Sequence, residues 1–232
     1  QIPGPRYLAA SQEITVLGGL GDETLPHLPF PEFSFGVNVS GAEEMRKAVR
    51  LFMKYGVDSI KLNLSGDNFT PQSPAGTTWM TDAEVGAAMD EVRLRGKRGT
   101  AHARSAASVR QALRHGITEM RWTYDPMLFT NARFNLVRLG ARPTAFLPHC
   151  YGDRRDAFNT GDTTDRLEVS WALDHAVGGA ATVAAPDDLQ LELPTDYHAL
   201  RAGDVARADE WRRQVSTALA TAVQSITAGS RP

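Results

Sequence analysis

The sequence contains only one cysteine, Cys150, among its 232 residues. One thiol cannot form an internal disulfide framework, and sparse cysteine is typical of a reducing compartment, so we expect a cytoplasmic protein. The sequence also lacks an apolar run long enough to cross a bilayer. No leader peptide is recognisable, and the start at Gln1 rather than at Met indicates a processed chain or a piece of a longer one.

An excess of one charge is also missing. The 25 Lys and Arg residues nearly balance the 27 Asp and Glu residues, and the formal net charge is −2. No electrostatic argument therefore favours nucleic acid or an anionic membrane as the partner. The apolar content of 42% is ordinary for a globular chain of one large or two small domains. We expect a small-molecule substrate.

The segment 56–67 predicts a buried strand that contains a cation and ends in a turn. Lys61 and Asn63 alternate with apolar residues, so they fall on the opposite face of the strand. A lysine inside an apolar strand is costly unless it is paired, carbamylated or linked to a metal. The alternative is a lysine whose amine reaches solvent from the strand end.

A helix, a glycine, a strand and a loop follow one another three times between residues 40 and 124. Capping signals begin the helices at Ser40, Thr81 and Ser105, and glycines end them at Gly56, Gly96 and Gly116. This alternation predicts an α/β fold of parallel βα units. Lys61 and His102 both lie towards the carboxyl ends of their strands, where such sheets gather their chemistry.

The remaining segments follow a different pattern. We expect a strand over 7–16 and a long loop over 25–39. After residue 124 we expect an α+β arrangement with antiparallel strands. Its predicted elements are a helix over 131–139, strands over 142–147 and 165–173, a linker over 176–194 with a short strand at 189–193, and helices over 195–226 with a break near Gly203.

Five motifs give residues 1–116 a family resemblance. They are Gly4-Pro-Arg6, Gly18-Gly-Leu-Gly-Asp22, Ile60-Lys61 with Ser65-Gly-Asp67, Thr81-Asp-Ala-Glu84, and Ala101-His102-Ala103. In this order they resemble the middle of a metal-dependent amidohydrolase barrel of the imidazolonepropionase and prolidase type. The resemblance implies part of a TIM-type barrel that hydrolyses an amide-type C–N bond. It also implies Lys61, carbamylated, and His102 as ligands of a divalent metal such as zinc, with Asp67 as a catalytic residue of the pocket.

Several ligands of that family have no counterpart in this sequence. The family has a His-x-His pair on its first strand, and none of the six histidines here forms one. Leu20 stands where the family often has histidine in its glycine-rich motif, and Met120-Arg121 stands where it has Glu-His. Stable zinc sites use three or four protein ligands, so we expect an incomplete site that binds zinc weakly. A homo-oligomer would be one source of further donors.

Residues 117–232 resemble the second half of a GNAT-type acetyltransferase. The motifs are Ile117–Pro126, Asn131–Ala141, and Tyr151-Gly152 followed by Asn159, Gly161, Asp165-Arg166 and Trp171. This resemblance implies an N-acyltransferase that uses acetyl-CoA, with Asn131 and Tyr151 near the cofactor or the acceptor. The glycine-rich loop that holds the coenzyme A pyrophosphate in that superfamily has no counterpart.

The sequence therefore predicts two half-domains, 1–116 and 117–232, as in a chimeric protein. They meet at His115-Gly116-Ile117, where both families have a helix, a glycine and a strand in this order. The leading interpretation is an amidohydrolase-like hydrolase, and the alternative is the acyltransferase. A third possibility, from a different class, is a non-catalytic scaffold or binding module.

Overall fold

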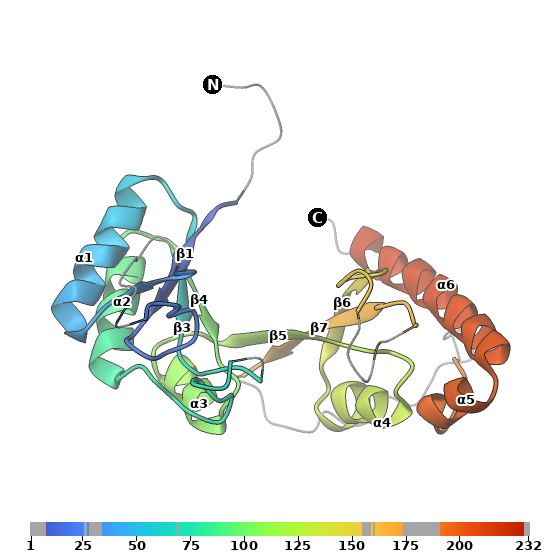
Figure 1. Ribbon diagram of the computed structural model, residues 1–232. Helices are drawn as coiled ribbons and strands as arrows, with labels where there is room; N and C mark the ends of the chain where they lie inside the picture. The colour runs from blue at the N-terminus through green and yellow to red at the C-terminus, as the bar shows by residue number, and fades with distance from the viewer. Residues whose placement is uncertain are drawn as a thin grey trace, which may run out of the picture. The chain divides into compact units, whose positions relative to one another are not determined.

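The computed structural model describes residues 8–25, 27, 34–68, 70–154, 159, 161–173 and 191–229. The chain divides into two units, Gln1–Thr118 and Glu119–Pro232, and each has its own sheet (Figure 1). The join predicted at residues 115–117 lies next to this division. The assignment of each half to a family remains a prediction.

The first unit contains a four-stranded parallel sheet with the strand order β2-β1-β3-β4. Its elements are β1 (Ala10–Thr15), β2 (Gly36–Asn38), α1 (Gly41–Lys54), β3 (Ser59–Asn63), α2 (Asp82–Leu94), β4 (Arg98–His102) and α3 (Ala106–Arg114). The parallel sheet with its βα alternation is confirmed up to residue 114. The prediction of loop throughout 25–39 was wrong, because β2 is only three residues long and too short for a period-2 pattern to show.

The capping signals were right at two helices and wrong at one. Thr81 and Glu84 form the predicted capping box of α2, and the Ser105 hydroxyl accepts the backbone N–H of Ser108 in α3. The Ser40 side chain makes no capping bond at α1. The Glu84 carboxylate of the neighbouring helix accepts the backbone N–H of Gly41 at 2.8 Å and so serves both helices.

One face of the parallel sheet carries the apolar core of the first unit. Ile14, Ile60 and Leu62 are completely buried there. They pack against α1 and α2, which lie side by side, through residues such as Val49 and Val85. Figure 1 shows these two helices beside the strands. The side chains that alternate with the apolar ones point to the opposite face.

The second unit contains an antiparallel sheet with the order β5-β7-β6. Its elements are β5 (Glu119–Tyr124), α4 (Phe129–Ala132), the π-helix η2 (Arg133–Arg138), β6 (Arg142–Leu147), β7 (Arg166–Ala172), α5 (Tyr197–Gly203) and α6 (Val205–Gly229). The antiparallel α+β arrangement is confirmed. The assignment of residues 117–124 to the parallel series was wrong, because β5 pairs antiparallel with β7.

Two further segments differ from expectation. The helix predicted over 131–139 begins at Phe129 and continues as a π-helix, in which Leu139 donates its backbone N–H to the Phe134 carbonyl. The short strand predicted at 189–193 lies partly outside the described residues, and residues 191–193 are not in a strand. Within the described part of the chain, no helix combines the length and the apolar character needed to cross a membrane.

Candidate functional site

Strand register brings the candidate site residues of the first unit onto one face. Lys61 of β3 lies opposite Glu13 of β1 and Thr100 of β4, and Asn63 lies opposite His102. Each residue is next to a core residue in its strand, so these polar side chains share the face opposite the apolar core. Lys61 and His102 therefore lie on neighbouring strands, two positions apart in register, with Lys61 at the centre of β3 and His102 at the carboxyl end of β4.

Lys61 occupies a partly buried position on this face. Burial lowers the pKa of its amine, and the nearby Glu13 carboxylate opposes the shift only in part. No residue that the structure describes accepts a hydrogen bond from the amine. Glu13 instead accepts a hydrogen bond from the Asn63 amide at 2.8 Å. Lys61 is thus a candidate amine with an increased neutral fraction at the polar face.

The neighbours of His102 determine which of its ring nitrogens donates. Its Nε2 atom lies 3.1 Å from the Gly66 carbonyl oxygen and 3.5 Å from Asp67 Oδ2. A carbonyl only accepts, so Nε2 carries the hydrogen and Nδ1 keeps the lone pair in the neutral ring. Burial lowers the pKa of His102, and the Lys61 charge acts in the same direction. The neutral ring therefore offers Nδ1 as a metal ligand or a base.

Asp67, the predicted pocket residue, lies between the Arg104 guanidinium and the His102 imidazole. Its Oδ1 accepts a hydrogen bond from Arg104 Nη1 at 2.8 Å, and its Oδ2 lies near His102. Sequence reasoning missed Arg104, although it lies only two residues after His102. Asp67 therefore helps to orient the imidazole, while its other oxygen is bound to the guanidinium.

The loop after β3 depends on a glycine. A Cβ atom on Gly66 would lie 1.9 Å from the Ser73 carbonyl oxygen, so the loop could not close with any other residue there. The Asp67 N–H donates to the same Ser73 oxygen at 2.8 Å. This tight packing holds the Gly66 carbonyl against His102 and places Asp67 beside the ring.

The glycine-rich motif before β2 has a structural role in this arrangement. The Asp22 carboxylate accepts hydrogen bonds from the Gly18 N–H at 2.7 Å, the Asn38 amide at 2.7 Å and both donors of Thr24. Burial tends to raise the pKa of Asp22, but these hydrogen bonds outweigh it and lower the pKa overall. The Leu20 carbonyl accepts the Asn63 amide at 2.8 Å, which attaches the loop to the polar face.

The donor set of this face does not fit a two-metal centre. Among the residues that the structure describes, no three His, Cys, Asp or Glu side chains lie close enough to hold a metal ion. Lys61 and His102 Nδ1 remain as possible ligands, and Asp67 is already bonded to Arg104. Two donors give at most a weak, exchangeable site.

The two residues predicted to contact acetyl-CoA are not brought together by any contact in the described structure. Asn131 is exposed on α4. Tyr151 lies in the loop after β6, where its hydroxyl is 2.8 Å from Thr123 Oγ1 and its ring centroid is 5.2 Å from the Arg166 guanidinium. Their cofactor roles remain predictions.

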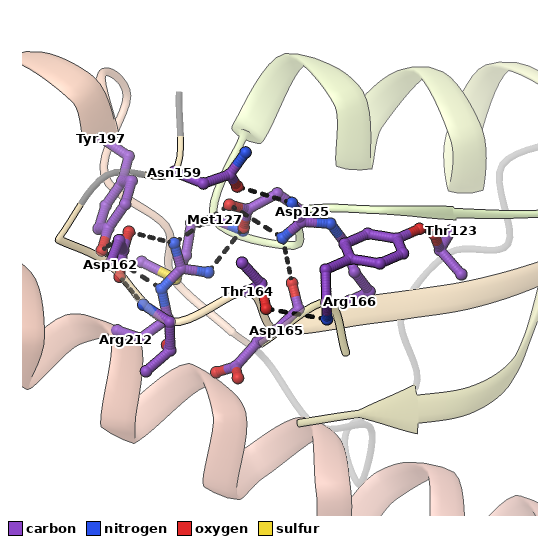
Figure 2. Close-up of polar contacts among 12 residues, drawn as sticks. Thr123, Asp125, Met127, Asn159, Asp162, Thr164, Asp165, Arg166, Tyr197 and Arg212 are labelled. Atoms are coloured by element: carbon purple, nitrogen blue, oxygen red, sulfur yellow. Dashed lines mark hydrogen bonds and ion pairs between the residues drawn. The ribbon is translucent and has the colours of Figure 1, made fainter. Parts of the chain in front are cut away.

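A buried charge network in the second unit was missed by sequence reasoning (Figure 2). Arg212 of α6 donates to both carboxylate oxygens of Asp125, at 2.8 and 3.1 Å, and to Asp162 at 2.5 Å. Its guanidinium lies 4.8 Å from the Tyr197 ring centroid. Burial opposes the charged form, but the bonds to Asp125 and Asp162 raise the pKa of Arg212, so it stays charged.

A cavity of about 630 Å³ adjoins this network. Oppositely charged groups line it and are already paired, as in the 2.8 Å contact between Arg201 and Asp209 and the 2.6 Å hydrogen bond from Ser216 to Asp165. The lining shows no excess of donors for one class of ligand. The network therefore reads as a structural link between the loop before β7 and the two C-terminal helices.

Comparison with known proteins gives a partial likeness to hydrolases. No family model and no curated protein matches the chain. A prolidase complexed with N-methylphosphonate-L-proline shares 27% identity over 50% of this chain and 30% of its own, with a TM-score of 0.44. A Xaa-Pro dipeptidase with bound methionine shares 28% identity over 50% and 30%, with a TM-score of 0.42. A. niger ochratoxinase shares 22% identity over 48% and 28%, with a TM-score of 0.41.

The chain thus spans less than a third of the length of these solved structures. The similarity is to amidohydrolases and prolidases, the class that residues 1–116 resemble in sequence. TM-scores below 0.5 do not establish a common fold. Nothing in these comparisons supports the resemblance of residues 117–232 to acetyltransferases.

Proposed function

We propose that the polar face of the first unit is part of a hydrolase site for an amide-type C–N bond. The observation that carries the proposal is the placement of His102 at the carboxyl end of β4, with Lys61 on the same face of the neighbouring parallel strand two register positions away. Both side chains are partly buried, and burial lowers both pKa values, which favours the neutral forms that ligate metals or accept protons.

Each residue of the face has a distinct part in this proposal. His102 presents the Nδ1 lone pair, because the Gly66 carbonyl binds the other nitrogen. Asp67 and Arg104 hold the ring in place. Lys61 and His102 are the ligands of a weakly held divalent metal, with zinc as the first metal to test. Further donors are needed for a complete site, and a second copy of the chain is one source of them.

Zinc binding by the full chain tests the proposal. We expect less than one zinc per chain after dialysis, measured by elemental analysis against protein concentration. Calorimetric titration should show weak binding that Lys61→Met and His102→Gln each remove. His115→Gln is the matched control, since His115 lies at the end of α3 and pairs with Asp82. Zinc uptake that is unchanged in Lys61→Met and His102→Gln would exclude this face as the metal site.

Hydrolysis is tested separately with a panel of chromogenic amides. We expect little or no turnover by the monomer, and turnover that depends on Lys61 and His102 if chains assemble. Turnover that persists in both variants would place the activity elsewhere. Absence of both zinc binding and turnover at every protein concentration would favour the non-catalytic scaffold or binding module.

The acyltransferase remains a separate proposal with no contact in its favour among the described residues. Its test is calorimetry of the full chain with acetyl-CoA, where we expect no binding because no glycine-rich pyrophosphate loop was found in the sequence. Micromolar binding that is lost in Tyr151→Ala would make the acyltransferase the better interpretation.

A further inference from the structure

The outer side of the helix formed by α4 and η2 combines exposed apolar and cationic side chains. Phe129, Phe134 and Val137 are 42%, 48% and 50% exposed. Arg133 and Arg138 are exposed between them, and neither forms an ion pair with any residue that the structure describes. The inner side of the helix is packed against the unit, because Asn135 is buried and its side chain accepts the Trp122 indole N–H at 3.2 Å.

The exposed residues form two rows along the helix. Phe129, Arg133 and Val137 succeed one another at four-residue intervals, and Phe134 and Arg138 form a second row beside the first. Residues four apart in a helix are surface neighbours roughly 5–6 Å apart. Apolar and cationic groups therefore alternate along the first row at intervals of about one helical turn.

The surrounding sequence adds no negative charge of its own. From Pro126 to Gly152 the chain contains no Asp or Glu, and Arg142 at the start of β6 is a further exposed cation. The whole protein carries a net charge of −2, so this surface is a local departure from the overall balance. Such a surface attracts a partner of negative charge.

We propose that this surface of α4 and η2 binds an acidic amphipathic helix of a partner protein. The alternating rows match a helix that presents a carboxylate between two apolar side chains at one-turn spacing. The two arginines bind carboxylates through their planar guanidinium groups, and the phenylalanines and Val137 take the apolar side chains.

Two other anionic surfaces complement these rows less well. Insertion into an anionic bilayer would bury the Arg133 guanidinium among acyl chains, between Phe129 and Val137. A nucleic-acid strand offers phosphates but no aliphatic side chain to cover Val137. The acidic helix satisfies both kinds of group.

The test uses the full chain and a labelled peptide of about 20 residues, long enough to be helical, with Glu and Leu alternating by turns on one face. Fluorescence anisotropy should give a dissociation constant of about 10 μM, as for a small transient interface. Arg133→Glu/Arg138→Glu should weaken binding at least about tenfold. The same double variant should bind a peptide in which Lys replaces Glu.

The matched control is Arg98→Glu/Arg207→Glu, which makes the same charge change at exposed positions on β4 and α6. We expect this control to bind the acidic peptide with nearly the affinity of the parent. The change in net charge alone should weaken its binding only slightly. Phe134→Ser tests the apolar contact independently of charge. If circular dichroism shows that the double charge-reversal variant is unfolded, Phe134→Ser takes its place as the test of this surface.

Two results would overturn the proposal. One is an acidic-peptide affinity that the test and control double variants reduce equally. The other is tighter binding of oligothymidylate or phosphatidylserine vesicles through Arg133 and Arg138, which would make the partner a nucleic acid or a membrane.

Discussion

Asp125, one residue beyond the end of β5, and Arg212, in the first third of α6, are joined by two parallel hydrogen bonds across 87 residues of sequence. The side chain of Arg212 is 5% exposed and that of Asp125 is 16% exposed. Asp162 binds the same guanidinium. This cluster connects the sheet of the second unit to its C-terminal helix.

Arg212→Met should therefore strongly destabilise the second unit. The substitution leaves Asp125 and Asp162 buried with less positive charge, and breaking a buried pair in this way costs about 3–5 kcal/mol. The measurement is urea unfolding followed by circular dichroism. Arg213→Met is the control, because Arg213 is exposed and pairs with Glu210 one turn away. Equal midpoints for the two variants would show that the network adds little.

Tyr124→Phe should stabilise the second unit by about 1 kcal/mol. The Tyr124 hydroxyl is buried without a hydrogen-bond partner among the described residues, so its removal relieves a desolvated polar group. Tyr55→Phe is the control, since Tyr55 is 75% exposed. A loss of stability in Tyr124→Phe would indicate a hydrogen bond that the described residues do not supply.

Stability should also fall between about pH 10 and pH 12 because of Tyr124. Burial raises the pKa of this phenol to about 12, above the unfolded value near 10. The folded state holds the proton more tightly, so the contribution is complete below about pH 10 and is lost as pH rises towards 12. Urea unfolding at several pH values checks this. The decrease should be smaller in Tyr124→Phe.

Two of the three predicted helix caps of the first unit, Thr81 and Ser40, should differ in energy. Thr81→Ala should cost about 1 kcal/mol, because the hydroxyl accepts the Glu84 N–H and the Glu84 carboxylate bonds back. Ser40→Ala should change stability by less than about 0.5 kcal/mol, since that side chain makes no capping bond. Equal losses in urea unfolding would contradict the assignment of the caps.

Gly66→Ala should destabilise the loop beside His102 by about 2–3 kcal/mol. The new methyl group would overlap the Ser73 carbonyl, so the loop must move away from the imidazole. Gly76→Ala is the matched control in the same loop, because no atom lies within 4 Å of its added Cβ. The His102 ring resonances should shift in the first variant and not in the second.

Local signals made the first unit largely predictable. Ser105, Thr81 and the glycines after the helices specify element ends within a few residues of sequence, and period 2 places Lys61 on the polar face. The same reasoning failed at Ser40, where Glu84 from another helix supplies the cap. That contact joins residues 43 apart in sequence.

The unpredicted parts depend on distant partners. The local sequence of β5 contains no pattern that predicts antiparallel pairing with β7 rather than continuation of the parallel sheet. The π-helix places Asn135 against Trp122, and that contact is visible only after the chain folds. For the candidate site, the sequence named Lys61, His102 and Asp67, whereas Glu13 and Arg104 became evident from strand register and contacts.

The link between Asp125 and Arg212 has a consequence for synthesis of the chain. Ribosomes make the N-terminal residues first, so both acids of the network appear well before the arginine that neutralises them. Until Arg212 has emerged, closing the second unit would bury Asp125 and Asp162 without their main counter-ion. The final helix therefore determines when this unit can finish folding, and a chain released before residue 212 should keep these loops open to proteases.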